Sequence, residues 1–152
     1  MVTVSMLSAT LLASGAACTF GTSAPVDKIA EGSVRVVLSG GLVQTVSLVP
    51  AIPPGGRNVQ VYSVIVNSGA QPVALQSRIC GLDYAGSLTL TEPPEWAKCA
   101  AYSRSVAIAV GDSVVVSDLM RVSSAPGQYE LRVRHAIDPA HWVSMQVVVR
   151  SP

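Results

Sequence analysis

The sequence predicts an all-β protein: an antiparallel β-sandwich of about seven to nine strands that follows an apolar N-terminal segment. From Ser33 onward, apolar and polar residues alternate with the period of two that is typical of strands. The alternating segments are short, and turns rich in Gly, Pro and Asn separate them. The apolar residues are mainly Val and Ala, with a single Phe. Val favours strands because its branched side chain packs well on a pleated surface.

The composition of the N-terminal segment is the basis for predicting the cellular compartment. The first 26 residues contain no charged side chain, and residues 1–17 combine an apolar stretch with small residues. Three interpretations remain open for residues 1–17: the leader of a bacterial lipoprotein, a retained membrane anchor, or a secretory signal cleaved after Ala17. Residues 18–32 are predicted to be a linker, since "TFGTSAP" is rich in turn-forming residues. The folded domain is predicted to span residues 33–152.

The residues "GAAC", which end at Cys18, resemble the lipobox of bacterial lipoproteins, with Gly15 where that family prefers Leu. The resemblance implies that Cys18 is lipidated and becomes the mature N-terminus. The chain has three cysteines, so lipidation of Cys18 would leave Cys80 and Cys99 to form a disulfide. Closing their loop of about twenty residues would stabilise the fold by roughly 3 kcal/mol. This pattern favours export to an oxidising compartment.

The strands of the domain are predicted from alternation, and their limits are predicted from turn residues. Gly40-Gly41 is a candidate hairpin turn, and Gly111-Asp112 is another. Between these two turns, Pro53 and Pro54 interrupt the alternation, because proline cannot donate a ladder hydrogen bond. In chain order, the predicted strands are residues 33–39, 42–49, 58–67, 72–79, 86–91, 104–110, 113–122, 127–137 and 141–150.

The last two predicted strands show the clearest separation of an apolar side from a polar side. In residues 127–137, the predicted core side carries Tyr129, Leu131, Val133 and Ile137, and the outward side carries Glu130, Arg132 and Arg134. In residues 141–150, the predicted core side carries Val143, Met145, Val147 and Val149. Because successive strand side chains point to opposite faces, Trp142 is predicted to lie on the outward side.

The segment "SSAPGQYELRVRH" adds a more specific resemblance. A Pro-Gly turn followed by Tyr129 at the start of an alternating strand is similar to the next-to-last strand of immunoglobulin-like domains. The resemblance implies that the Tyr129 hydroxyl donates a hydrogen bond back to the preceding corner. Across roughly residues 57–137, the order of "VYSVIVNSGAQPVAL", "AIAVGDSVVV" and "PGQYELRV" resembles the bacterial intracellular proteinase inhibitor-like family. That resemblance implies an immunoglobulin-like sandwich with an Asn-x-Gly turn after an early strand.

Composition and motifs argue against nucleic-acid binding and catalysis. The formal net charge is +1, which gives no electrostatic basis for a nucleic-acid partner. His135, Asp138 and His141 suggest a metal site, but two nitrogens and one carboxylate from a single hairpin seldom close one. Glu92 and Glu95 flank two prolines and are expected to lie in a solvated loop. We therefore expect no enzyme activity, no metal and no cofactor.

Large side chains outside the core pattern are the candidate interface residues. Trp96, Tyr102 and Trp142 are aromatic anchors of the kind that binding surfaces use. Arg132 and Arg134 share one outward face and could dock an acidic partner or lipid headgroups. The alternatives are a solvated sheet face for the two arginines and a position at the open ends of the core for the two tryptophans.

These observations together predict a non-catalytic binding or scaffold domain, anchored to a membrane in the bacterial periplasm or cell envelope. Low charge and an apolar leader suit an accessory subunit packed on an integral-membrane complex, such as an electron-transfer assembly. The expected partners are the membrane, through the N-terminal segment, and other envelope proteins. The alternative is a proteinase-inhibitor-like binding module that presents the loop around Trp96 or residues 53–57 as bait. A small hydrolase or metal carrier is a third hypothesis.

Overall fold

The computed structural model describes residues 26–77, 81–92, 104–135 and 141–152. In chain order, its strands are β1 (Val26–Ala30), β2 (Ser33–Val37), β3 (Leu42–Val49), β4 (Asn58–Asn67), β5 (Val73–Ser77), β6 (Leu82–Gly86), β7 (Leu90–Thr91), β8 (Arg104–Ile108), β9 (Ser113–Val122), β10 (Gly127–His135) and β11 (Val143–Val149). A short 3-10 turn, η1 (Ser39–Gly41), joins β2 to β3 at the predicted hairpin turn. The predicted all-β class is therefore confirmed.

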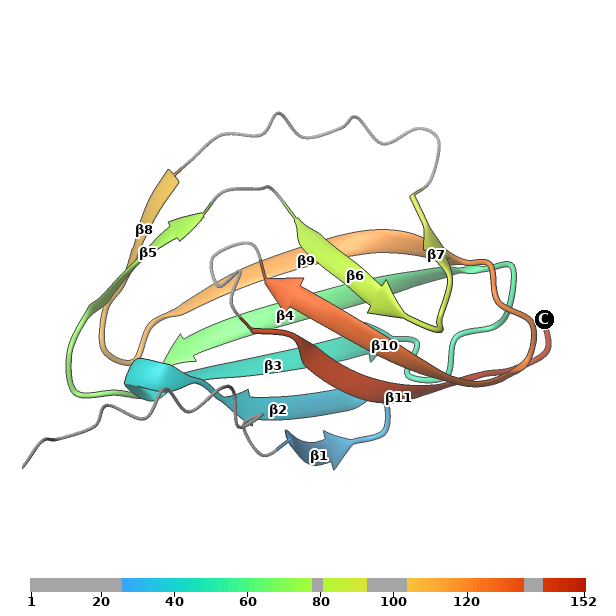
Figure 1. Cartoon of the computed structure of the whole chain (residues 1–152), viewed down its shortest axis with the longest axis horizontal. Coiled ribbons are helices and arrows are strands. Elements are labelled where there is room, and N and C mark those ends of the chain that lie inside the picture. Colours follow the sequence, from blue (N-terminus) through green and yellow to red (C-terminus); the bar gives the residue numbers. More distant parts are fainter. Residues whose placement is uncertain (1–25, 78–80, 93–103, 136–140) are drawn as a thin grey trace, which may run out of the picture.

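The strands form two facing layers, and every strand pair is antiparallel (Figure 1). The larger layer is a six-stranded sheet in the order β1-β2-β3-β4-β9-β7, and the smaller layer is a three-stranded sheet in the order β11-β10-β6. β5 and β8 form a separate two-stranded sheet, and along the chain β5 leads toward β6 of the smaller layer. Across the layers, β11 lies next to β2, and β6 lies next to β9. This arrangement is sandwich-like, as the alternation predicted.

The core lies between the two layers, because every second side chain of each strand points into the space between them. On β10 and β11, the structure buries six of the residues predicted for the core: Leu131, Val133, Val143, Met145, Val147 and Val149. The larger layer faces them with Val46, Val59, Val61, Ile65 and Val122, each at most 1% exposed. Full burial of such a side chain contributes about 1.5–3 kcal/mol to the free energy of unfolding, so this apolar core supplies most of the stability of the fold.

Two predicted turn features are confirmed in the structure. The Tyr129 hydroxyl donates a hydrogen bond to the carbonyl oxygen of Ala125 at 2.9 Å. At the end of β4, the buried side chain of Asn67 accepts a hydrogen bond from the backbone of Gly69 at 3.0 Å. The same amide donates to the carbonyl oxygen of Ile108 at 3.0 Å. Asn67 therefore shapes the turn that follows β4 and also ties that turn to β8.

Asp118 links the two layers on the side where β6 faces β9. Its Oδ2 atom accepts hydrogen bonds from the backbone N–H of Leu82 at 2.9 Å and from the hydroxyl of Tyr84 at 3.0 Å. Burial raises the pKa of Tyr84 above its ordinary value, and the negative charge of Asp118 raises it further. The neutral hydroxyl is therefore the form that the fold stabilises.

Three segments differ from the prediction. The end of the predicted linker 18–32 forms β1, which pairs with β2; its Asp27 and Lys28 break the apolar alternation. β6 was not predicted, because Gly81 and Gly86 flank a mixed segment that resembles a turn. β7 is two residues long, whereas the prediction was residues 86–91.

In the described part of the chain, no helix is long and apolar enough to cross a membrane.

Candidate interaction site

Three of the five predicted interface residues come together on the outer face of the smaller sheet. Arg132 and Arg134 point outward from β10, and Trp142 directly precedes β11. The guanidinium carbon of Arg134 lies 4.7 Å from the centre of the Trp142 ring, and that of Arg132 lies 5.4 Å from it. Both distances fall within the range of about 6 Å for a cation–π interaction. These three residues are called the Arg–Trp stack below.

The register between β10 and β11 produces the stack. Arg132 lies opposite Ser144, and Val133 lies opposite Val143. Trp142, one residue before β11, is therefore beside Arg134 on the outward face. A shift by one residue would turn the ring toward the core, because side chains alternate between the two faces of a strand.

Asp83 on β6 completes the site, and it was not among the predicted residues. The register places it opposite Arg134. The Nε atom of Arg134 donates to Oδ2 of Asp83 at 2.8 Å, and Nη2 forms an ion pair with the same oxygen. The two side chains are 33% and 32% exposed, so the pair contributes no more than about 1 kcal/mol to stability. Its main effect is to hold Arg134 over the ring and to neutralise its charge.

Arg132 differs from Arg134 in its partners. Its side chain is half-buried, and among the described residues its buried Nε atom has no hydrogen-bond partner and its guanidinium forms no ion pair. The exposed carboxylate of Glu130 lies two residues earlier on the same face. A guanidinium presents a planar set of donors that matches a carboxylate in two parallel hydrogen bonds. Arg132 is therefore the group of the stack that can bind an acidic ligand.

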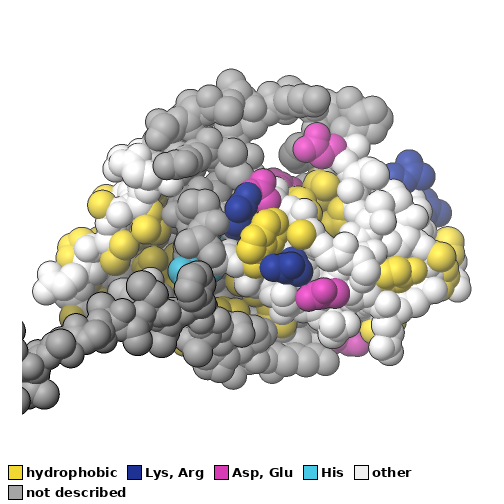
Figure 2. Space-filling view, viewed as in Figure 1, with side chains coloured by type: hydrophobic (Ala, Val, Ile, Leu, Met, Phe, Trp, Pro, Cys, Tyr) yellow, Lys and Arg dark blue, Asp and Glu magenta, His cyan; other side chains and the backbone are white. Residues whose placement is uncertain are grey.

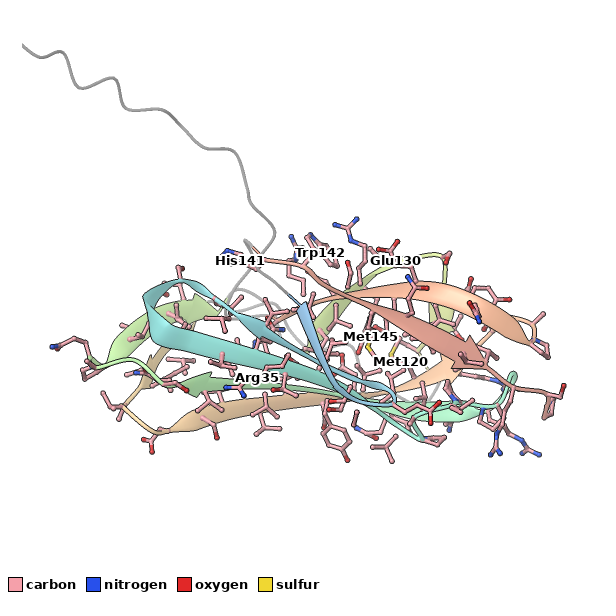
Figure 3. All side chains as sticks on the ribbon, turned by 90° about the horizontal axis from the view of Figure 1, so that it is seen from below. Arg35, Met120, Glu130, His141, Trp142 and Met145 are labelled. Atoms are coloured by element: carbon pink, nitrogen blue, oxygen red, sulfur yellow. The ribbon has the colours of Figure 1, made fainter. Side chains whose placement is uncertain are left out.

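The stack is accessible at the surface. Figure 2 shows hydrophobic side chains beside basic groups on one face of the molecule, with acidic groups close by. In Figure 3, Trp142 and Glu130 project from the side of the smaller sheet, whereas Arg35 of β2 lies on the opposite layer. The patch thus combines a large partly exposed ring, one neutralised arginine and one arginine that forms no ion pair with any described residue.

The remaining predicted site residues are Cys18, Cys80, Cys99, Trp96 and Tyr102, and all five lie outside the described residues. Lipidation of Cys18, a disulfide between Cys80 and Cys99, and an interface role for the other two aromatic residues stay predictions.

The two histidines occupy different environments. His135 is buried at the end of β10, and His141 is partly exposed. Within the ranges that the structure describes, no three His, Cys, Asp or Glu side chains are grouped so that they could hold a metal ion. Asp138, the third member of the considered metal site, lies outside those ranges.

The loop at residues 53–57, considered above as protease bait, is anchored to the end of the sandwich. Pro53 and Gly55 are buried. The backbone N–H of Gly55 donates to the carbonyl of Arg150 at 3.0 Å, and the N–H of Arg150 donates to the carbonyl of Pro53 at 3.2 Å. Gly56 adds a bond to the carbonyl of Val122 at 2.8 Å. Gly56 and Arg57 of the same loop are exposed, and a bait role for this loop stays a prediction.

The fold and the site together define an all-β, sandwich-like domain with an aromatic and cationic patch on the outer face of its smaller sheet. Compared with models of known protein families and with curated proteins, the sequence matches none. The geometry of the Arg–Trp stack is accordingly the basis for a functional proposal.

Proposed function

We propose that this protein is a non-catalytic binding or scaffold domain of the bacterial cell envelope that contacts a partner protein through the Arg–Trp stack. The observation that supports the proposal is the stack itself. Binding hot spots are enriched in Trp and Arg, and a partly exposed ring with two guanidinium groups close to it has that composition. The hydrogen bond of Tyr129 to Ala125 is consistent with an immunoglobulin-like domain, which often serves in binding.

The membrane part of the proposal is based on the N-terminal sequence. The first 26 residues carry no charge and include the lipobox-like "GAAC". A lipidated Cys18 or a retained apolar segment would hold the domain close to the bilayer. We propose that it serves there as an accessory subunit of an integral-membrane complex.

The stack also indicates the chemistry of the partner surface. Asp83 neutralises Arg134, whereas Arg132 forms no ion pair among the described residues. The partner is therefore expected to place a carboxylate opposite Arg132 and an apolar or aromatic group over the exposed part of the Trp142 ring. An acidic protein segment with an adjacent apolar side chain meets both requirements.

The proposal can be tested in native membranes. We compare the full chain with a variant that carries Arg132→Ala and Trp142→Ala, and with the matched control Arg35→Ala, which removes an exposed arginine from the other layer. After mild detergent solubilisation, native gel electrophoresis and sedimentation report the size of the complex. We expect wild type and control to migrate in one large complex and the double variant to be released. A wild-type protein that sediments alone would refute the proposal, as would a double variant that stays assembled.

A further inference from the structure

We propose a second binding site, separate from the Arg–Trp stack: the free edge of β11 accepts an extended peptide segment of a partner protein, which adds a strand to the smaller sheet. Among the strands that the structure describes, β11 is an edge strand whose one partner is β10. It has seven residues and is the longest edge strand that the described residues form; β1, β5, β6 and β8 have five each, and β7 has two.

Hydrogen bonds on both sides of the smaller sheet identify the backbone groups on the free edge. The N–H and the carbonyl of Arg150 both bond to the loop at Pro53–Gly55 and so point away from β10. In an antiparallel strand, alternate residues direct both groups to the same side. The backbone groups of Ser144, Gln146 and Val148 therefore point to the free edge as well.

The other side of β10 gives the same result. The carbonyl of Glu130 accepts hydrogen bonds from the backbone of Ser87 and Leu88, so Glu130 is turned toward β6. Its odd-numbered neighbours on β10 are then turned toward β11 and pair with the odd-numbered residues of β11. Three N–H groups and three carbonyl groups of β11 consequently face outward, and no backbone hydrogen bond joins them to the rest of the described chain.

The sequence and register of β11 lack the features that normally prevent strand addition. Natural edge strands are kept short or carry charges, prolines or bulges. The sequence of β11, VSMQVVV, contains neither a charge nor a proline, and its register with β10 is regular. By contrast, β1 contains Asp27 and Lys28 and has a register irregularity, and the first N–H of β6 is bonded to Asp118.

A groove runs along the free edge. Two hollows of about 150 and 240 Å³ lie between β11 and the turn that joins β1 to β2, and both are lined by Gly32 and Gln146. The backbone of Gly32 has φ +68°, and a Cβ atom there would lie 2.6 Å from the Cα of Ala51. Its carbonyl also accepts a hydrogen bond from Leu48 at 2.8 Å. The wall of the groove is therefore held in place before any ligand arrives.

The groove indicates the chemistry of its occupant. The backbone donors and acceptors are regularly spaced along the edge, and only another extended backbone can form hydrogen bonds with all of them. One hollow is lined by the buried side chains of Val34 and Met145 and by the more exposed Ser33, Ser144 and Gln146, and the exposed Glu31 lines the other. We therefore infer a segment without acidic side chains and with apolar side chains at alternate positions. A second copy of this chain is the other possible occupant, and the experiment below distinguishes it from a peptide.

Hydrogen exchange tests the site on the full chain. The probe is a ten-residue peptide of alternating Val and Thr, with a control peptide in which every second amide is N-methylated. We expect the probe to slow exchange of the Ser144, Gln146 and Val148 amides by at least about tenfold, while the amides of Met145 and Val147 are protected with or without it. Unchanged exchange at the three edge amides would overturn the proposal. Protection that depends on protein concentration without peptide would assign the edge to a second copy instead and would also overturn it.

Two substitutions at one position sharpen this test. Gln146→Pro removes an N–H that faces the free edge and leaves the bonds to β10 intact, whereas the matched control Gln146→Thr keeps that N–H. We expect the proline variant to bind the probe at least about tenfold more weakly and the threonine variant to bind within about twofold of wild type. Equal binding by all three would contradict the site. The Arg132→Ala, Trp142→Ala double variant should bind the probe normally, so failure here and failure of the proposed function are distinguishable.

Discussion

Single side chains connect segments that are distant in the sequence. Asp118 bonds to Leu82 and Tyr84 across the two layers, and Asp83 bonds to Arg134 across two strands of the smaller sheet. None of these pairs could be predicted from the sequence, because all of them involve β6, which was not predicted. Tyr129 is the exception, since its partner Ala125 lies only four residues away and the turn between them has a familiar pattern.

The first prediction concerns the Tyr129 hydroxyl. Tyr129→Phe removes its hydrogen bond to the carbonyl of Ala125, so we expect the free energy of unfolding to fall by about 1 kcal/mol. Urea denaturation would show a lower midpoint with an unchanged slope. The control Tyr62→Phe alters an exposed tyrosine of β4 whose hydroxyl makes no hydrogen bond within the described residues, and it should have little effect. Equal losses in the two variants would contradict the structural role of Tyr129.

The second prediction concerns stability at high pH. Burial, and then the charge of Asp118, raise the pKa of Tyr84 above 10.0, so the folded state keeps this proton where the unfolded state loses it. The resulting contribution is fully present below about pH 10 and decreases above it by up to about 1.4 kcal/mol per pH unit. Tyr84→Phe removes this dependence. The difference in unfolding free energy between wild type and variant should be constant up to about pH 9 and shrink at higher pH. Parallel stability curves up to pH 11 would contradict the raised pKa.

At the scale of elements, alternation predicted the strands that bury one full side. The predicted strands 58–67 and 113–122 have the same limits as β4 and β9. In Figure 3, Met120 of β9 and Met145 of β11 lie between the layers, as alternation requires. Short strands were missed where their outward residues form specific pairs, as in β6, or where charged residues interrupt the pattern, as in β1. Such strands depend on their partners more than on their own sequence.

Part of the candidate site was also predictable from the alternation of side chains between the two faces of a strand. Alternation placed Arg132, Arg134 and Trp142 on an outward face, and the structure agrees. The stacking itself depends on the register between β10 and β11, which alternation fixes only to within two residues. Asp83 could not be predicted, because its pairing with Arg134 needs the position of β6 in the sheet.

The third prediction tests the two sides of the strands. Leu131 on β10 is fully buried, so Leu131→Ala should lower the free energy of unfolding by about 2–5 kcal/mol through lost burial and the cavity left behind. Val115 on β9 is 57% exposed, so Val115→Ala should change it by less than about 0.5 kcal/mol. Chemical denaturation measures both. Comparable losses would mean that the outer face of β9 is covered in the folded protein.

At the scale of the whole molecule, the smaller sheet carries both proposed sites. The Arg–Trp stack lies on its outer face, and the groove runs along its free edge at β11. One partner could therefore contact the face with an acidic segment and the edge with an extended one. Simultaneous contacts of this kind raise affinity because the second contact becomes intramolecular once the first has formed.

The most direct test of the proposed function is site-specific photo-cross-linking in intact cells. A photoreactive phenylalanine analogue replaces Trp142, and the matched control places it at Arg35 on the other layer. Cross-links are resolved by denaturing electrophoresis and identified by mass spectrometry. The proposal predicts a discrete cross-link from position 142 to one envelope protein and none from position 35. Absence of a cross-link from position 142, or the same products from both positions, would contradict it.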